Sequence, residues 1–122
     1  MHKIKTQEGS IVFDYTVKNK GEIAGKKKLI ELSIDNKKKN SILIYLNSDR
    51  TKNNLSVRVV DNKGVIHETS KNIDYWEIGE KHQVAVTWNM KEKIVLYIDG
   101  QKANEIKDKI NIVGEEFNSH IY

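Results

Sequence analysis

The sequence contains neither cysteine nor proline. Without cysteine, disulfides and thiolate metal sites are excluded. Without proline, the turns must rest on Gly, Asn and Asp. No apolar run approaches the roughly 20 residues of a membrane span, so we expect no membrane insertion. The N-terminus lacks the apolar core of a signal peptide. We would expect this protein outside the cell or at its surface only if the chain is an excised module of a longer protein.

Arginine is scarce, although the chain carries a formal net charge of +4. Arg50 and Arg58 are the only arginines, whereas bidentate recognition of bases and phosphates favours arginine. The lysines include two clusters, at 26–28 and 37–39, which we place in loops. This pattern favours solvated loop charges over an anionic partner, and it predicts no specific nucleic-acid binding.

Apolar and polar residues alternate along much of the chain. Segments 81–89 and 94–98 show this period of two most clearly, which predicts two strands with one buried face each. The dipeptide Asp99-Gly100 indicates a tight turn, because Gly accepts a positive φ. The residues expected in the core are Phe13, Val84, Val86, Trp88, Leu96 and Ile98.

The remaining strands follow from the same alternation. Residues 41–47 are apolar almost throughout, which indicates burial on both faces, and 73–79 is expected to be irregular. No stretch shows a helical period. Short strands at this spacing predict an all-β protein with an antiparallel β-sandwich, in one domain over 1–122. The other predicted strands are 10–18, 29–35, 55–61, 65–70, 101–106 and 110–113.

One set of residues resembles the signature of a known family. The set is Trp76, Gly79, His82, Val84-Ala85-Val86-Thr87-Trp88 and Leu96-Tyr97-Ile98-Asp99-Gly100. In order and spacing it is similar to the central motif of concanavalin A-like domains, and most similar to their laminin-G-like and pentraxin-like branch. The resemblance covers roughly residues 9–121. It implies a jelly roll and is specific for fold rather than for function.

Domains of this family are usually longer, with an additional N-terminal strand pair. The resemblance therefore implies a domain that is incomplete at both ends, with uncovered sheet edges. We expect a homodimer that pairs such edges or faces; the alternative is a monomer whose edge is protected by a short N-terminal strand. The apolar residues expected to remain uncovered are Ile110, Ile112, Val113, Phe117 and Ile121.

Five residues are candidates for ligand binding. Tyr45, Arg58 and Tyr97 are expected on solvent-facing sides of strands, and Tyr75 and Trp76 lie outside regular structure. An aromatic ring flanked by polar side chains is a common way to bind a sugar. For Trp76 we favour packing over binding, since the resemblance implies that this ring packs beneath the following strand.

A metal site is a weaker prediction. Many relatives in the resembled family hold Ca²⁺ through loop Asp and Asn oxygens. The corresponding candidates here are Asn47, Asp49, Asp61 and Asn62. Because such residues are also ordinary turn formers, we expect no cofactor.

The carboxylates do not predict catalysis. Glycosidases place two carboxyl groups about 5–9.5 Å apart, whereas Glu31 and Asp35 would lie roughly 13 Å apart along one strand. The Glu-x-Asp-x-x-Glu motif of hydrolytic relatives is absent. We therefore predict a non-catalytic module that recognises carbohydrate or a protein surface and is part of a larger protein or assembly. The alternatives are a structural module that self-associates through sheet edges and, remotely, a glucanase-type glycoside hydrolase.

Overall fold

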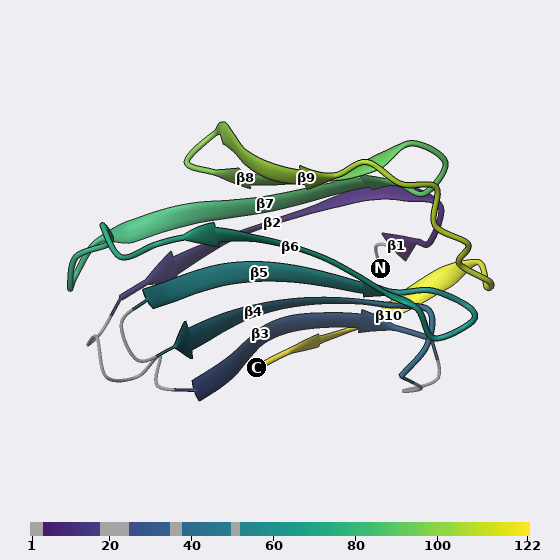
Figure 1. Ribbon diagram of the computed structural model, residues 1–122, viewed down its shortest axis with the longest axis horizontal. Coiled ribbons are helices and arrows are strands. Elements are labelled where there is room, and N and C mark those ends of the chain that lie inside the picture. Colours follow the sequence, from purple (N-terminus) through teal and green to yellow (C-terminus); the bar gives the residue numbers. More distant parts are fainter. Residues whose placement is uncertain (1–3, 18–24, 35–37, 50–51) are drawn as a thin grey trace.

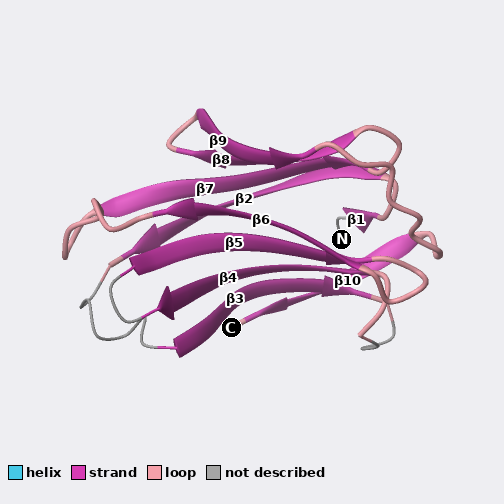
Figure 2. Ribbon diagram, viewed as in Figure 1, coloured by secondary structure: helices cyan, strands magenta, loops and turns pink. Residues whose placement is uncertain are grey.

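The part of the chain that the structure describes forms ten β-strands. The structure is a computed structural model that describes residues 4–17, 25–34, 38–49 and 52–122. Figure 2 shows strands joined by loops, and the described residues contain no helix. Accordingly, none of these residues belongs to a helix long and apolar enough to cross a membrane.

Two antiparallel sheets pack against each other (Figure 1). In spatial order, the six-stranded sheet consists of β1 (Ile4–Lys5), β10 (Glu116–Ile121), β3 (Gly25–Ser33), β4 (Ser41–Asp49), β5 (Lys52–Val60) and β6 (Ile66–Asn72). The four-stranded sheet consists of β2 (Glu8–Thr16), β7 (Lys81–Asn89), β8 (Lys93–Ile98) and β9 (Gln101–Ile106). The predicted all-β antiparallel sandwich is confirmed.

The core lies between the two sheets. Of the residues expected there, only Phe13 is partly rather than fully buried. Its strand, β2, is an edge strand of the four-stranded sheet, so one side of the ring has no neighbouring strand. The central residues of the core are Leu32, Ile42, Ile44, Leu55, Val57, Val59, Val84, Val86, Trp88 and Leu96.

Strand β4 is buried on both of its faces, as its apolar run predicts. Ile42 and Ile44 face the core, while Leu43 and Tyr45 lie on the outer face and are still only 7% and 1% exposed. The outer face of the six-stranded sheet must therefore be covered by other side chains. These covering side chains form the site described below.

The hairpin between β8 and β9 turns in two residues. Asp99 and Gly100 both have positive φ, 52° and 81°, and Ile98 pairs directly with Gln101. Positive φ at both central residues is the type I′ pattern, whose twist matches that of the flanking strands. The turn predicted from Asp99-Gly100 is confirmed.

Three expected segments differ from the structure. The lysines at 26–28 were expected in a loop but belong to β3, where the ammonium of Lys26 lies 4.8 Å from the centre of the Tyr45 ring. The connection implied between the expected segments 41–47 and 55–61 is shorter, because β4 and β5 pair as far as Asp49 and Lys52. Residues 110–113 form no strand; the backbone N–H of Ile110 instead donates to the carbonyl of Met90 at 2.8 Å.

A β-bulge interrupts the alternation of β3. Lys28 pairs with Tyr45 and Ile30 pairs with Ile44, so Leu29 is an extra residue without a partner on β4. Leu29 and Ile30 are both buried. Such an insertion moves every following side chain to the other face. Lys26 and Lys28 consequently share the outer face with Glu31.

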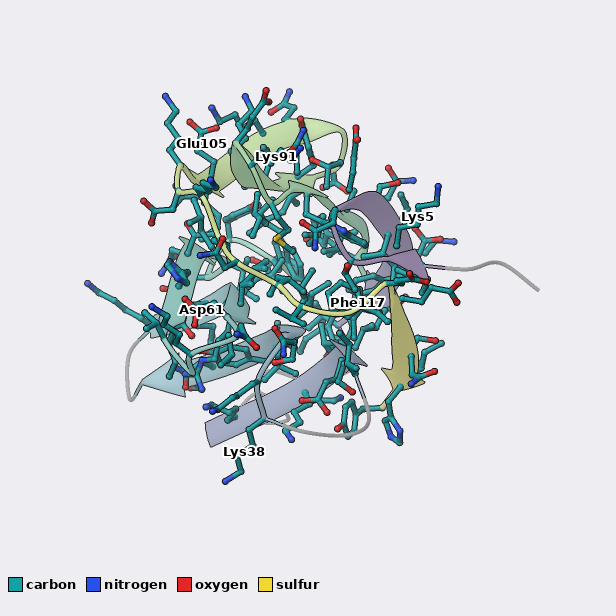
Figure 3. The ribbon with its side chains drawn as sticks, turned by 90° about the vertical axis from the view of Figure 1, so that its right-hand side faces the viewer. Lys5, Lys38, Asp61, Lys91, Glu105 and Phe117 are labelled. Atoms are coloured by element: carbon teal, nitrogen blue, oxygen red, sulfur yellow. The ribbon has the colours of Figure 1, made fainter. Side chains whose placement is uncertain are left out.

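The closing strand is present and mostly covered. β10 pairs with β3 along one side and with the two residues of β1 along the other. The expectation of an uncovered apolar run is wrong for Ile110, Ile112 and Phe117, which are at most 6% exposed. These side chains turn into the core, as Figure 3 shows for Phe117. Only Val113 and Ile121 remain exposed, at 57% and 77%.

The Trp88 ring ties the N-terminal segment to the core. It is 2% exposed, it packs edge-on against Phe117, and its Nε1 donates to the carbonyl of Lys5 at 3.1 Å. Opposite it in β2 lies Gly9, where a Cβ would be 2.6 Å from a ring carbon. The ring thus occupies the space that any other residue at position 9 would need.

Replacing this ring tests the core. We expect Trp88→Ala to lower the free energy of unfolding by about 3–5 kcal/mol, through lost burial and a cavity. Trp88→Phe keeps an aromatic ring but loses the hydrogen bond, so a smaller decrease is expected. Urea unfolding followed by circular dichroism measures both variants. An unchanged midpoint for Trp88→Ala would show that the ring is not part of the core.

Candidate functional site

A polar cluster lies on the outer face of the six-stranded sheet. Arg58 on β5 pairs across the sheet with Glu68 on β6, and its Nε donates to Glu68 Oε2 at 2.7 Å. The hydroxyl of Tyr45 donates to the same oxygen at 2.7 Å, and an Arg58 amino group donates to that hydroxyl at 3.3 Å. Burial, and then the hydrogen bond to Glu68, raise the pKa of Tyr45. The cluster therefore holds Tyr45 protonated and fixed in place.

The Tyr45 ring is covered by cations. The Lys26 ammonium and the Arg58 guanidinium lie 4.8 and 5.3 Å from its centre. Both side chains extend apolar stems over the sheet and keep their charges at the surface. With 1% of its surface exposed, Tyr45 has no free face on which a ligand could stack. The fold thus brings the predicted binding residues Tyr45 and Arg58 together. Tyr45, however, lies beneath the surface and supports it instead of contacting a ligand.

Beside this cluster the outer face is hollowed. The hollow has a volume of about 470 Å³, which is within the range of small-molecule sites. Its floor is partly apolar, formed by Leu43, Val60 and Ile66, and Ser41 adds a hydroxyl. The residues around the floor are Lys26, Lys28, Glu31, Lys38, Lys39, Arg58 and Gly64. We call this feature the outer-face hollow.

Tyr122, which the sequence analysis did not select, contacts Glu31 and Lys28 of the outer-face hollow. Its ring itself lines a neighbouring hollow, together with Phe13 and Ile121. Tyr122 is 54% exposed, and its hydroxyl donates to Glu31 Oε1 at 3.1 Å. The Lys28 ammonium lies 5.5 Å from the centre of its ring, and its backbone N–H donates to the carbonyl of Leu29. The available signal was the alternation of β10, which places His120 opposite Glu31 and Tyr122 two residues further on.

The hollow contains no pair of carboxylates at glycosidase spacing. Glu31 is the one carboxylate among its described lining residues. The register runs Glu31, Leu43, Arg58, Glu68 across four strands, so Glu31 and Glu68 are three strand spacings apart, about 14 Å. Glu68 is in addition paired with Arg58. Asp35, considered with Glu31 above, lies outside the described residues.

A second cluster surrounds His82 at the start of β7. The His82 ring stacks on Trp76 at 4.3 Å with an interplanar angle of 8°, and Tyr75 meets both rings edge-on. Trp76 is 2% exposed, whereas Tyr75 is 55% exposed. Trp76 therefore packs beneath β7, as the family resemblance implied, and offers no face to a sugar. Tyr75 remains accessible but does not line the outer-face hollow.

Two carboxylates flank His82. Its Nδ1 lies 2.7 Å from Asp99 Oδ2, and its Nε2 lies 3.3 Å from Glu80 Oε1. The hydrogen bond with His82, and then the backbone N–H of Gln83, lower the pKa of Asp99. The backbone N–H of Glu77, and then His82, lower the pKa of Glu80. The cluster joins the start of β7 to the end of β8 and is explained by packing.

The other predicted site residues lie apart. Tyr97 is half-buried on the four-stranded sheet, in a separate hollow with Thr87 and Val95. The four metal candidates divide into two pairs at opposite ends of the six-stranded sheet, because Asn47 and Asp49 end β4 whereas Asp61 and Asn62 follow β5. They therefore do not form one Ca²⁺ site.

The Asp61 carboxylate stabilises the turn in which it lies. One of its oxygens accepts the backbone N–H groups of Lys63 and Val65, both at 2.9 Å, and the other faces His67. Burial alone would raise the pKa of Asp61, but these hydrogen bonds outweigh burial and lower it. No group of three or more His, Asp or Glu side chains within the described residues is arranged to hold a metal ion.

Comparison with known proteins yields structural matches alone. No protein-family model matches the sequence, and no curated protein does. The binding domain of botulinum neurotoxin DC, solved in complex with SialylT, matches with a TM-score of 0.65 and 19% identity, over 93% of this chain and 27% of that chain. The fold is a jelly-roll β-sandwich.

Other jelly rolls that match include binding modules and enzymes. The carbohydrate-binding module CBM66 from Bacillus subtilis has a TM-score of 0.55 and 12% identity, over 94% of this chain and 68% of that one. Beta-agarase A from Zobellia galactanivorans has a TM-score of 0.55 and 11% identity, over 96% and 50%. The chain spans 27% of the botulinum neurotoxin DC chain and 34% of another matched chain, the binding domain of botulinum neurotoxin serotype G. At these identities the matches establish the jelly roll and not its activity.

The Asp99 carboxylate makes stability depend on pH. Because its pKa is lowered in the folded state, its stabilising effect is fully present above the unfolded pKa of about 3.9 and is lost as pH falls through the folded value. We expect Asp99→Asn to lower the free energy of unfolding at pH 7 by up to about 1 kcal/mol, since solvent screens this half-exposed group. Asn also tolerates the positive φ.

Urea unfolding between pH 7 and pH 2 measures this effect. The difference between Asp99→Asn and the wild type should shrink as pH falls below 4. A difference that is constant over the whole range would show that the charge of Asp99 contributes nothing.

Proposed function

We propose that this chain is a non-catalytic carbohydrate-recognition module, part of a larger protein or assembly, whose binding surface is the outer-face hollow. The observation that carries the proposal is the hollow itself. An apolar floor lies among charged and hydroxyl side chains on a rigid sheet, the combination expected of a small-ligand site. The Tyr45, Arg58 and Glu68 cluster supports that floor from one side.

The sugar contacts follow from the chemistry of the hollow. The C–H faces of a pyranose pack on Leu43, Val60 and Ile66, and its hydroxyls reach Ser41 and the lysine ammonium groups. Tyr122 adds an exposed ring beside Glu31 and Lys28. The matched structures support the ligand class, since they include a carbohydrate-binding module and a toxin binding domain in complex with SialylT.

The residues of the family motif support a place for the chain within the concanavalin A-like superfamily. Trp76 and His82 stack on each other, and Gly79 takes a positive φ of 87° before β7. These are the residues on which the resemblance to the laminin-G-like and pentraxin-like branch rests. We assign the chain to that branch, in which the motif is a packing element.

The absence of catalysis is part of the proposal. Glu31 has no partner carboxylate in the described lining of the hollow, and Glu68 is about 14 Å away and ion-paired. A glycosidase mechanism needs two carboxyl groups within about 9.5 Å of each other. The hollow is therefore proposed to bind a saccharide without cleaving it.

Removing the exposed ring tests the surface. We expect Tyr122→Ala to weaken saccharide binding roughly tenfold, or about 1.4 kcal/mol, through the loss of aromatic contact. Tyr75→Ala removes an equally exposed ring that contacts the Trp76 and His82 rings and is not among the described lining residues of the hollow, and it should leave affinity unchanged. A glycan array identifies the ligand, and isothermal titration calorimetry measures both variants.

Several results would contradict the proposal. Weaker binding in Tyr75→Ala with normal binding in Tyr122→Ala would move the site to the His82 cluster. New reducing ends released from a bound oligosaccharide would show that the module is catalytic. If no glycan binds, a protein surface or an assembly role takes its place.

Self-association remains a second candidate function, favoured by one observation. The outer edge of β2 has no strand beside it in the described sheet. It adjoins a hollow of about 350 Å³ that is lined by Phe13, Tyr15, Leu29 and Ile121. Unpaired edges of this kind form a template for a second chain. A two-fold dimer through this edge would bury Ile121, which is 77% exposed.

Sedimentation equilibrium over micromolar concentrations tests the dimer. If the edge pairs, the wild type forms a dimer and Ile121→Lys, which places a charge in the contact, forms a monomer. Val113→Lys is the matched control, because Val113 is exposed but lies in a loop outside that hollow. A monomer at every concentration, or dissociation by both substitutions alike, would reject edge pairing.

A further inference from the structure

The outer-face hollow has a strong imbalance of charge. Five cationic side chains and one carboxylate line it, and the guanidinium of Arg58 is already paired with Glu68 at 2.7 Å. The remaining cations are Lys26, Lys28, Lys38 and Lys39. Among the described residues, no carboxylate forms an ion pair with any of these four lysines.

Some lysines outside the hollow are paired with carboxylates. Lys102 and Lys107 both contact Glu105, at 2.9 and 3.3 Å, and Lys81 lies 4.0 Å from Asp14. In the outer-face hollow, by contrast, four lysines without such a partner among the described residues gather around a surface that contains one carboxylate. Like charges around a surface with a partly apolar floor raise the local positive potential and attract anions.

The lysines stand at both ends of the hollow. Lys26 lies opposite Asn47, near the end of β4, whereas Lys38 and Lys39 immediately precede the start of β4 at Ser41. Six residues of extended chain separate Asn47 from Ser41, which corresponds to about 20 Å. A single phosphate or sulfate ion does not span that distance. An extended ligand with repeated negative charges does.

The kind of anion follows from the other residues. The lysine ammonium is a point charge on a flexible stem. It can donate hydrogen bonds to a carboxylate or a sulfate without the fixed geometry that a guanidinium requires. The described lining residues contain no row of aromatic rings on which nucleobases could stack. Leu43, Val60 and Ile66 instead present aliphatic surface, which suits the C–H faces of sugar rings.

We propose that the outer-face hollow selects acidic oligosaccharides, whose carboxylate or sulfate groups are matched by Lys26, Lys28, Lys38 and Lys39. This inference rests on the proposed function and adds the chemical class of the saccharide. The β3 bulge is what makes it possible, because it places Lys26 and Lys28 on the same face as Glu31. The two lysines are then about 6.6 Å apart along the strand.

A matched pair of ligands tests the selection. The probes are oligogalacturonate hexamer, its fully methyl-esterified form, a sulfated hexasaccharide and a single-stranded oligonucleotide of six thymidines. We expect the carboxylated and sulfated hexamers to bind at least tenfold more tightly than the methyl ester at 50 mM salt. Raising the salt to 500 mM should remove most of this difference, because exposed charges are screened.

A matched pair of variants locates the site. Lys28→Gln/Lys38→Gln removes two charges from the hollow, and Lys5→Gln/Lys91→Gln removes two charges elsewhere. Each variant lowers the formal net charge from +4 to +2, since 4 − 2 = 2. Figure 3 shows Lys38 projecting from the six-stranded sheet, with Lys5 and Lys91 on other sides of the molecule. We expect the hollow variant to lose at least tenfold in affinity for acidic hexamers and the control less than threefold.

The possible results separate the two claims. Equal affinity for the acid and its methyl ester would overturn the selection but leave carbohydrate recognition standing. Equal losses in both double variants would reduce the effect to net charge and overturn the site. Binding of the oligonucleotide in preference to every saccharide, or no binding of any probe, would overturn both. Unchanged unfolding midpoints in the variants confirm that the losses are not due to misfolding.

Discussion

The alternation of side chains between the two faces of each strand is the constraint on which this structure depends, and a β-bulge interrupts it in β3. An unbroken β3 would place Lys26 and Lys28 on the face opposite to Glu31 and Ser33, among the side chains of the core. The extra residue, Leu29, has no partner on β4 and enters the core with Ile30. Burial of these two apolar side chains, at roughly 1.5–3 kcal/mol each, stabilises the bulge. The outer face thereby receives two lysines beside Glu31.

The burial of β4 on both faces links the core to the proposed binding surface. Leu43 and Tyr45 face away from the core but are buried, because the stems of lysine and arginine cover them. The hydrogen bonds among Tyr45, Arg58 and Glu68 fix that covering layer. The same residues that close the outer face thus also leave a partly apolar hollow ringed by cations. A cluster that stabilises the sheet therefore also shapes the proposed binding surface.

The two histidine-containing motifs of the chain contribute to packing. His82 is held between Trp76, Asp99 and Glu80 at the start of β7, and His67 faces Asp61 in the turn that leads to β6. In each case a carboxylate whose pKa is lowered accepts backbone N–H groups and also meets the imidazole. The chain has no proline to restrict its turns. These contacts restrict two of them instead.

The sequence by itself determined the fold class, most of the strands, the Asp99-Gly100 turn and the packing role of Trp76, because period-two patterning and turn chemistry are local properties. It did not determine the site. From the sequence, the lysines at 26–28 were expected in a solvated loop. No local sequence pattern predicts the bulge, and none shows that the Tyr45 ring lies beneath Lys26. Tyr122 was missed because its partners, Glu31 and Lys28, are more than ninety positions away. Cross-strand register is a tertiary property, and it decided which charges and rings share one face.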